Sequence, residues 1–336
     1  MKRFLDLSDL ADERLEAVLR RARQLEANPL SSALRGKVVA LLFMNPSLRT
    51  LASMEAGVKQ LGGDTFVITP GQSSWALETR DGVVMDGDAV EHVREAIPVL
   101  AEYADALGVR CFAKGKDLAE DLADGVIRRM AELCPKPFVN LESAAAHPCQ
   151  ALADWKTLED VGIPRRGGRF VLSWAYHPKP LALAVPAAAL TMAARRGMDV
   201  TILRPDGYAL PGPLTERAAR LAAASGGSIR QTADRREALE GAHVLYAKSW
   251  GAPDLYGRPA EEAERRRPLR DWCVAEDWFA TARPDARFMH CLPVRRNVKV
   301  RDEVLDGPRS LVLREAGNRL HAQKALLLEL LTEEGA

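Results

Sequence analysis

Several short polar motifs in this chain combine residue types that bind small anions. The first is Ser47-Leu-Arg-Thr50, which follows the apolar run 37–43 and a turn at Asn45 and Pro46. The apolar run predicts a strand buried on both faces, and the turn predicts that a helix starts at Ser47. The N–H groups of a helix N-terminus, two hydroxyls and an arginine would together bind a phosphate. An ordinary helix cap with one exposed arginine is the alternative interpretation of this segment.

Two further motifs could act on a carbonyl group. His147-Pro-Cys-Gln150 is predicted to open a helix after a strand, where the histidine could donate a hydrogen bond to a carbonyl oxygen and the glutamine could hold an amide. His290-Cys-Leu-Pro293 could present a thiol and backbone carbonyls at a proline-stiffened turn. The alternatives are a helix cap for the first motif and a buried apolar cysteine for the second. Gly317-Asn-Arg319 places one more arginine at the start of the last predicted helix.

The composition argues against several functional classes. Lys and Arg number 47 and Asp and Glu number 46, and the resulting net charge of +1 argues against nucleic-acid binding. No Gly-rich dinucleotide or Walker-type motif follows a strand, the five cysteines form no CxxC pair, and the six histidines form no HExxH motif. We therefore expect no cofactor and no metal. The longest apolar run, 181–194, contains Pro186 and is too short to span a bilayer, so we expect a cytoplasmic protein with no membrane partner.

Predicted strands and helices alternate along the chain in two series, which are separated near 165–168. The apolar runs predict strands over 37–43, 65–68, 106–112 and 137–141, and then over 169–174, 199–203, 228–231, 243–247 and 287–290. Helices are predicted over 8–26, 47–61, 91–103, 118–133 and 148–161, and then over 181–196, 215–224, 235–239 and 317–331, with long segments at 70–88 and 249–271 outside them. This alternation predicts an α/β fold of two domains, each a parallel β-sheet flanked by helices, linked by inter-domain helices. Ligands of such sheets bind at the C-terminal ends of strands, which is where the polar motifs lie.

The order and spacing of Ser-x-Arg-Thr, His-Pro-x-Gln and His-Cys-Leu-Pro make the chain resemble the aspartate/ornithine carbamoyltransferase family over essentially its whole length. The strings Tyr176-His-Pro-Lys-Pro180, Tyr246-Ala-Lys-Ser-Trp-Gly251 and Asn318-Arg-Leu-His321 are most similar to the N-acetylornithine branch of that family. The resemblance implies a carbamoyl-phosphate-binding domain at 1–147, joined by the C-terminal helix 317–334, and an acyl-ornithine-binding domain at 148–316. It implies transfer of a carbamoyl group from carbamoyl phosphate to the δ-amine of N-acetyl-L-ornithine, in arginine biosynthesis.

The resemblance also implies a role for each motif residue. The residues expected to hold carbamoyl phosphate are Ser47, Leu48, Arg49, Thr50, Arg110, His147, Gln150, Cys291, Leu292 and Arg319. Of these, Arg110, His147, Gln150 and Cys291 are the expected catalytic residues: Arg110 and His147 would polarise the carbamoyl carbonyl, and Gln150 with the backbone at Cys291 would hold the NH2 group. The residues expected to bind the acyl-ornithine are Trp75, Glu91, Glu142, Lys248, Leu292 and Arg295. Lys299 matches a possible carboxylated lysine of this branch.

The acceptor is inferred from one missing motif and one matching residue. Lys248-Ser-Trp-Gly251 stands where ornithine enzymes of the family have an Asp and a Ser-Met-Gly motif that hold the free α-ammonium. An N-acylated ornithine has no α-ammonium, so an Asp there would be a buried charge without a partner. Glu91 matches the acetyl enzymes, whereas the succinyl enzymes have Pro at that position. N-succinylornithine and ornithine are the alternative acceptors, and a non-catalytic α/β metabolite-binding protein is the alternative of another class.

Two further expectations follow from the resemblance. The family is trimeric with shared active sites, so we expect a homotrimer in which Trp75 serves a neighbouring subunit. Leu51 departs from the family pattern, which usually has a second arginine directly after Ser-x-Arg-Thr. This departure concerns a supporting ion pair more than the phosphate contacts.

Overall fold

A computed structural model describes residues 2–332, which divide into two compact units. Unit 1 comprises residues 2–113, 120–149 and 319–332, and unit 2 comprises 114–119 and 150–318. The chain passes from one unit to the other within α6 (Pro148–Asp160) and again within α12 (Val312–Leu331). Residues 333 and 334, which end the predicted helix 317–334, lie outside the described part of the chain.

The sheet of unit 1 contains five parallel strands. Their order is β1 (Arg3–Phe4), β7 (Phe138–Glu142), β6 (Ala106–Arg110), β2 (Val38–Phe43) and β3 (Asp64–Ile68). The sequence of β2 is apolar throughout and its residues from Val39 to Phe43 are buried, as expected for a strand covered on both faces. The predicted parallel α/β architecture is therefore confirmed for this unit.

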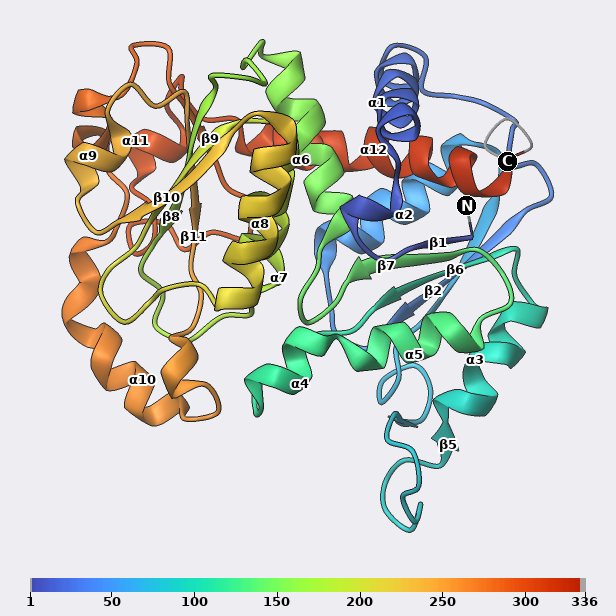
Figure 1. Cartoon of the computed structure of the whole chain (residues 1–336). Coiled ribbons are helices and arrows are strands. Elements are labelled where there is room, and N and C mark those ends of the chain that lie inside the picture. The colour runs from blue at the N-terminus through green and yellow to red at the C-terminus, as the bar shows by residue number, and fades with distance from the viewer. Residues whose placement is uncertain (1, 333–336) are drawn as a thin grey trace. The chain divides into compact units, whose positions relative to one another are not determined.

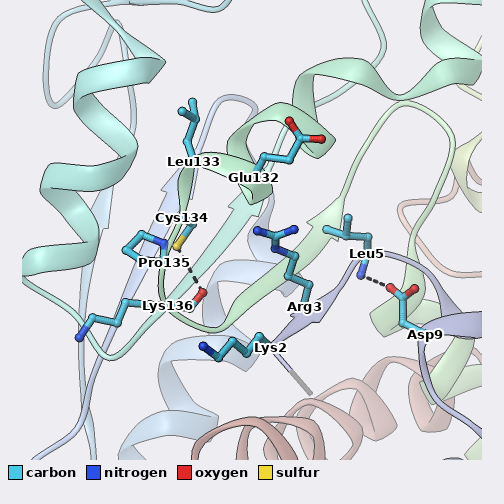
Figure 2. Close-up of a pocket in the computed structure, with 9 residues that line it drawn as sticks. All are labelled: Lys2, Arg3, Leu5, Asp9, Glu132, Leu133, Cys134, Pro135 and Lys136. Atoms are coloured by element: carbon cyan, nitrogen blue, oxygen red, sulfur yellow. Dashed lines mark hydrogen bonds between the residues drawn. The ribbon is translucent and has the colours of Figure 1, made fainter.

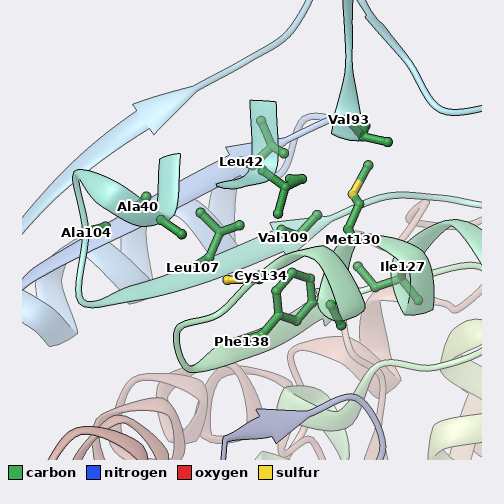
Figure 3. Packing of buried hydrophobic residues seen from close by; sticks show 13 residues of the cluster. Ala40, Leu42, Val93, Ala104, Leu107, Val109, Ile127, Met130, Cys134 and Phe138 are labelled. Carbon is green, nitrogen blue, oxygen red and sulfur yellow. The ribbon is translucent and has the colours of Figure 1, made fainter. Parts of the chain in front are cut away.

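Helices cover both faces of this sheet (Figure 1). They are α1 (Asp12–Ala27), α2 (Leu48–Gln60), α3 (Val93–Glu102), α5 (Gly125–Leu133) and the unit 1 part of α12. On one face, sheet residues such as Leu107 and Phe138 pack with Ile97 of α3 and Ile127 and Met130 of α5 (Figure 3). On the other face, the Lys324 ammonium of α12 donates to the Pro29 carbonyl at 2.6 Å and to the Gln60 side chain of α2 at 2.8 Å.

Unit 2 contains a second sheet of five parallel strands. Their order is β10 (Ser228–Thr232), β9 (Asp199–Leu203), β8 (Arg169–Trp174), β11 (Val244–Lys248) and β12 (Arg287–Met289). Its helices are α7 (Ala184–Arg195), α8 (Gly212–Ser225), α9 (Arg235–Leu239), α10 (Pro259–Arg266) and α11 (Asp302–Leu305). Figure 1 shows α7 and α8 on one side of this sheet and α9 on the other. The many alanines of α7 are buried and let it pack closely on α8 and on the strands.

Two of the predicted helices have other boundaries in the structure. The predicted helix 118–133 is broken into α4 (Leu118–Ala123) and α5 by Asp124, which has a left-handed backbone with φ of 54°. The Asp124 carboxylate accepts hydrogen bonds from the Ser143 hydroxyl at 2.5 Å and the Ala144 N–H at 3.1 Å, and these contacts favour the break. The last helix begins at Val312 rather than at Gly317, because the segment before Gly317 continues the helical backbone.

Short elements account for the other differences. The segment 70–88 contains β4 (Leu77–Glu78), which pairs in parallel with β5 (Glu91–His92), so α3 starts at Val93 rather than at Glu91. The segment 249–271 contains α10. The edge strand β1 was not predicted, and neither were the short 3-10 helices η1 (Leu7–Asp9), η2 (Pro253–Leu255), η3 (Arg267–Asp271) and η4 (Glu276–Thr281). Elements of two to six residues carry too little periodicity to be recognised in a sequence.

The core packing shown in Figure 3 predicts how much the loss of one buried side chain lowers the free energy of unfolding. Phe138 is fully buried at the start of β7, so Phe138→Ala should lower the free energy of unfolding by about 3–5 kcal/mol. Chemical denaturation followed by circular dichroism measures this change. Leu30→Ala, at a residue that is exposed in the same unit, is the matched control and should change stability by less than about 0.5 kcal/mol. Equal stabilities of the two variants would contradict this description of the core.

Candidate active site

The N-terminus of α2 presents an anion-binding geometry in unit 1. Ser47 caps the helix with an extended backbone, and its hydroxyl accepts a hydrogen bond from the Thr50 N–H at 3.3 Å. The side chain of Leu48 is exposed, so only its backbone could serve a ligand here, whereas Thr50 is buried. The first turn of a helix of this length carries partial positive charge, which favours a phosphate or carboxylate.

Arg319 of α12 links this helix start to the histidine motif. Its guanidinium donates to the Thr50 hydroxyl at 3.1 Å and to the Gln323 side chain at 3.0 Å, and it lies 3.5 Å from His147 Nε2. Gln323 in turn accepts a hydrogen bond from Ser53 of α2 at 3.1 Å. Arg319 is only 2% exposed, and its guanidinium has three polar neighbours: Thr50, Gln323 and His147.

Arg110 and Glu142 complete this group at the ends of β6 and β7. The two residues are neighbours where the register of these strands shifts, and their side chains form a buried ion pair. The same Glu142 oxygen lies 3.3 Å from His147 Nε2. Burial lowers the pKa of Arg110, the ion pair with Glu142 opposes this shift, and the positive charges of Arg319 and Arg49 add to it. Three arginines of unit 1 therefore lie close enough to interact electrostatically, and one of them, Arg110, pairs with Glu142.

Unit 2 contains a second cationic group, centred on Cys291. The ammonium of Lys248, at the end of β11, donates to the Cys291 Sγ at 3.4 Å. Lys299 is buried nearby, and burial together with the charge of Lys248 lowers its pKa to about 7. Arg295 and Arg266 also lower this pKa, whereas Cys291 raises it. A carboxylate entering this group would be attracted by several cations at once.

Arg295 is oriented by His177, a residue to which the sequence analysis assigned no role. Arg295 Nε donates to His177 Nε2 at 3.1 Å. Because a guanidinium can only donate, Nε2 is the acceptor in this contact, and Nδ1 lies 2.8 Å from the Lys179 carbonyl and 3.1 Å from the Lys179 N–H. Burial is the main cause that lowers the pKa of His177 to about 4, and the charges of Lys299 and Arg295 act in the same direction. The signal in the sequence was the position of His177 three residues after the end of β8, at the C-terminal edge of the sheet where ligands bind.

The remaining predicted site residues lie in other parts of the two units. Gln150 is buried in α6, where its amide donates to Asp154 at 2.8 Å and to Glu315 at 3.0 Å. Trp75 is 57% exposed in unit 1, and its indole N–H donates to the Glu91 carboxylate at 2.5 Å. Leu292 has a left-handed backbone with φ of 55°. The structure therefore brings the predicted residues together in two groups, one within each unit, and joins Trp75 to Glu91.

A separate hollow in unit 1 contains none of the predicted site residues. Its volume is about 780 Å³, and it is lined by Lys2, Arg3, Leu5, Asp9 and 132–136 (Figure 2). The Asp9 carboxylate already accepts the Leu5 N–H at 2.6 Å, and Cys134 contacts the Lys136 carbonyl at 3.5 Å. The charges that line this hollow have both signs, so it lacks the cationic character of the two groups described above.

Residues 2–332 lack the features of two other kinds of site. No group of three or more His, Cys, Asp or Glu residues in this part of the chain is arranged to hold a metal ion. None of the helices described there is long and apolar enough to cross a bilayer.

Comparison with known proteins identifies the family. Residues 2–160 match the carbamoyl-P binding domain of aspartate/ornithine carbamoyltransferases, and residues 185–330 match the Asp/Orn binding domain. The chain is 44% identical to an N-acetylornithine carbamoyltransferase of Xanthomonas campestris pv. campestris over 98% of each chain. It is 35% identical to an N-succinylornithine carbamoyltransferase of Bacteroides thetaiotaomicron over 98% of this chain and 99% of that one.

Solved structures agree with the sequence relatives. The crystal structure of an acetylornithine transcarbamylase complexed with acetylcitrulline aligns with a TM-score of 0.95 and 43% identity over 99% of this chain and 100% of that one. A mutant of N-acetyl-L-ornithine transcarbamylase, complexed with carbamyl phosphate and N-succinyl-L-norvaline, aligns with the same TM-score at 44% identity over 98% of this chain. The resemblance inferred from the sequence motifs is thereby confirmed: the chain belongs to the aspartate/ornithine carbamoyltransferase family.

Proposed function

We propose that the protein transfers the carbamoyl group of carbamoyl phosphate to the δ-amine of N-acetyl-L-ornithine, giving N-acetyl-L-citrulline and phosphate. The observation that carries the proposal is the contact of Arg319 with Thr50 and His147, since it joins an anion-binding helix start to a group that can polarise a carbonyl. The relatives named above support the choice of acceptor, because the acetylornithine enzyme is more similar to this chain than the succinylornithine enzyme. The reaction would serve arginine biosynthesis in the cytoplasm.

The proposal assigns the phosphate and the carbonyl to unit 1. The first turn of α2, from Ser47 to Thr50, holds the phosphate with Arg110 and Arg319. Thr50, His147 and Arg110 polarise the carbamoyl oxygen, on which negative charge develops in the tetrahedral intermediate. Arg110 is shielded from water, so its interaction with that oxygen is stronger than it would be in solution.

The acceptor is assigned mainly to unit 2. Lys248 and Arg295 pair with the α-carboxylate, and Arg295 is already oriented for this by His177. Glu142 contacts the acceptor amine or amide, and Glu91 contacts the acyl group together with Trp75. The amide of Gln150 and the backbone at Cys291 and Leu292 hold the carbamoyl NH2 group.

The chemical step then needs neither a covalent enzyme intermediate nor a cofactor. The neutral δ-amine attacks the carbamoyl carbon, a new C–N bond forms, and the C–O bond to phosphate breaks. The departing phosphate takes the proton that the amine loses. Much of the acceleration comes from ordering two substrates, since orientation of two reactants can supply about 7–11 kcal/mol.

Lys299 is proposed as a site of carboxylation. Its neutral amine would attack CO2 to give a carbamate and release one proton. A pKa of about 7 supports this proposal, because a substantial fraction of the amine is then unprotonated at neutral pH. The product carries a negative charge, which would be stabilised by the neighbouring Lys248.

Comparison of three acceptors tests the proposed function. Carbamoyl phosphate is incubated with N-acetylornithine, N-succinylornithine or ornithine, and the ureido product is measured by a colorimetric assay. Acetylornithine should be carbamoylated fastest, and His147→Ala serves as the inactive control. Turnover of ornithine alone would overturn the assignment of an acyl acceptor, and a chain that binds carbamoyl phosphate without any turnover would be a non-catalytic binding protein.

A substitution of Arg319 tests the phosphate assignment. Arg319→Lys keeps one positive charge but loses the planar fork that reaches Thr50, Gln323 and His147 at once. Loss of charge-assisted hydrogen bonds of about 1.5–3 kcal/mol should raise the KM for carbamoyl phosphate at least about tenfold. Arg309→Lys, at an arginine that pairs with Glu276 away from the site, is the matched control. If both variants leave this KM unchanged, Arg319 does not hold the phosphate.

A mixing experiment tests the proposed homotrimer with shared sites. Trp75 is exposed and held by Glu91, which suits a side chain that serves a neighbouring subunit. Light scattering should give three times the 36.8 kDa mass of the chain. Trp75→Ala and His147→Ala should each be nearly inactive alone, yet regain activity when their subunits are mixed and reassembled, because some sites then contain both native residues. Mixed trimers without recovered activity would show that Trp75 acts within its own subunit.

A further inference from the structure

The helix α10 of unit 2 buries an ion pair that was not among the predicted site residues. Glu262 and Arg266 are one helical turn apart, and each is 1% exposed. The Arg266 guanidinium donates to the Glu262 carboxylate. A buried ion pair often adds no stability over apolar side chains of similar volume. Stability alone therefore does not explain why these two residues are buried.

Arg266 holds the turn that follows β8. Its Nη1 donates to the carbonyl oxygens of His177 at 2.8 Å and Lys179 at 3.0 Å. A guanidinium carries five N–H donors in one rigid plane, so it can bind several carbonyls in fixed directions, which a lysine ammonium cannot do. The backbone of this turn is thereby held on both sides of Pro178.

The same ion pair holds the segment that follows β11. Arg266 Nη2 donates to the Trp250 carbonyl at 3.4 Å. Glu262 accepts a hydrogen bond from the Ala252 backbone N–H at 3.2 Å. Both contacts lie just after Lys248, the last residue of β11. One ion pair in α10 thus contacts the chain beyond the ends of two neighbouring strands of the sheet.

Aromatic rings limit the directions that the guanidinium can take. Its central carbon lies 5.7 Å from the ring centroid of Trp174 and 5.6 Å from that of Tyr208. Both rings are fully buried, and the Trp250 indole N–H donates to the Tyr208 carbonyl at 2.9 Å. A guanidinium is attracted to the faces of such rings. Arg266 is therefore fixed by the rings as well as by its hydrogen bonds.

The two segments that Arg266 holds carry groups assigned to the acceptor carboxylate. The His177 ring accepts a hydrogen bond from Arg295 Nε at 3.1 Å. Lys248 donates to Cys291 Sγ at 3.4 Å, directly before the segment that contacts α10. A displacement of the turn at His177 would move the ring against which Arg295 is oriented. The ion pair in α10 can therefore act on the acceptor site through the backbone.

We infer that Arg266, with Glu262, is a positioning residue for the acceptor carboxylate: it holds the turn at His177 and the segment after Lys248 so that Arg295 and Lys248 meet that carboxylate. Arg266 acts through these two segments and not by touching the substrate. The inference rests on the proposed function for the identity of the ligand. The contacts that hold the two segments lie entirely within unit 2.

Arg266→Lys tests the positioning role by its effect on the two substrates. The ammonium keeps a positive charge beside Glu262 but loses the fork that reaches His177, Lys179 and Trp250 at once. The KM for the acceptor should therefore rise about tenfold. The KM for carbamoyl phosphate and kcat should stay within about threefold, because only binding of the acceptor is weakened.

The neighbouring arginine of α10 provides the matched control. Arg265 pairs with Asp254 at 2.7 Å on the surface, so Arg265→Lys should leave both KM values and kcat unchanged. N-acetylornithine, N-succinylornithine and ornithine carry the same α-carboxylate, so the KM is measured with whichever acceptor the native protein uses. An unchanged acceptor KM in Arg266→Lys, or equal rises in both KM values, would overturn the positioning role.

A neutral pair keeps the inference testable if Arg266→Lys does not fold. Arg266→Gln combined with Glu262→Gln leaves no unpaired charge in the interior, which is the costly result of removing one partner alone. One amide then replaces the fork, so the acceptor KM should again rise at least about tenfold while the KM for carbamoyl phosphate does not.

Crystal structures of the native protein and of Arg266→Lys decide the inference without an assay of activity. The native protein should show Arg295 Nε donating to the His177 ring, and Arg266→Lys should lose this contact. An unchanged contact would overturn the inference even in an active carbamoyltransferase. If the native protein carbamoylates none of the three acceptors, the proposed function fails, and the two crystal structures still show whether Arg266 positions Arg295.

Discussion

Positive charge held away from water is the constraint on which the rest of this structure depends. Arg110, Arg319, Lys248 and Lys299 are all buried, although nearly all lysines and arginines of a globular protein normally reach solvent. An unpaired buried charge costs several kcal/mol. Each of these groups therefore needs an anion, a neutral acceptor or the loss of its proton, and the surrounding side chains supply these in different ways.

The two units meet this constraint differently. In unit 1, Glu142 pairs with Arg110, while Arg319 donates to the neutral oxygens of Thr50 and Gln323. In unit 2, Arg295 donates to a neutral histidine, and Lys299 has a lowered pKa. Buried cations of this kind are the groups that would pair with the phosphate and the carboxylate of the proposed substrates.

The carboxyl pair of Asp154 and Glu315 shows the same physical rule with the opposite sign. Burial raises the pKa of Glu315 well above its ordinary value, and the charge of the neighbouring Asp154 adds to this shift, so the surroundings favour the uncharged form of Glu315. A rigid acceptor network of this kind orients the Gln150 amide before any ligand arrives. Preorganised polar groups of this type stabilise developing charge without having to rearrange during the reaction.

Local sequence determined much of the scaffold and the motifs. The apolar run from Val38 to Phe43 is long enough to predict a buried strand, and the turn that follows it predicts the helix cap at Ser47, so the start of α2 could be located from a few neighbouring residues. The same holds for the alternation of strands and helices that predicts the parallel sheets. By contrast, the break at Asp124 depends on contacts with Ser143 and Ala144, about 20 residues away, which no local pattern contains.

The candidate site shows the same division between local and tertiary information. The motifs identified Arg319, His147 and Gln150 as polar residues near strand or helix ends, but not their partners. Gln150 and Glu315 are 165 residues apart, and only folding brings them into a hydrogen bond at 3.0 Å, in surroundings that raise the pKa of Glu315. The protonation of His177 and Lys299 is likewise a property of their buried surroundings. The sequence by itself determined which groups could do chemistry, and only the tertiary structure decided their charge and direction, because burial and long-range contacts set both.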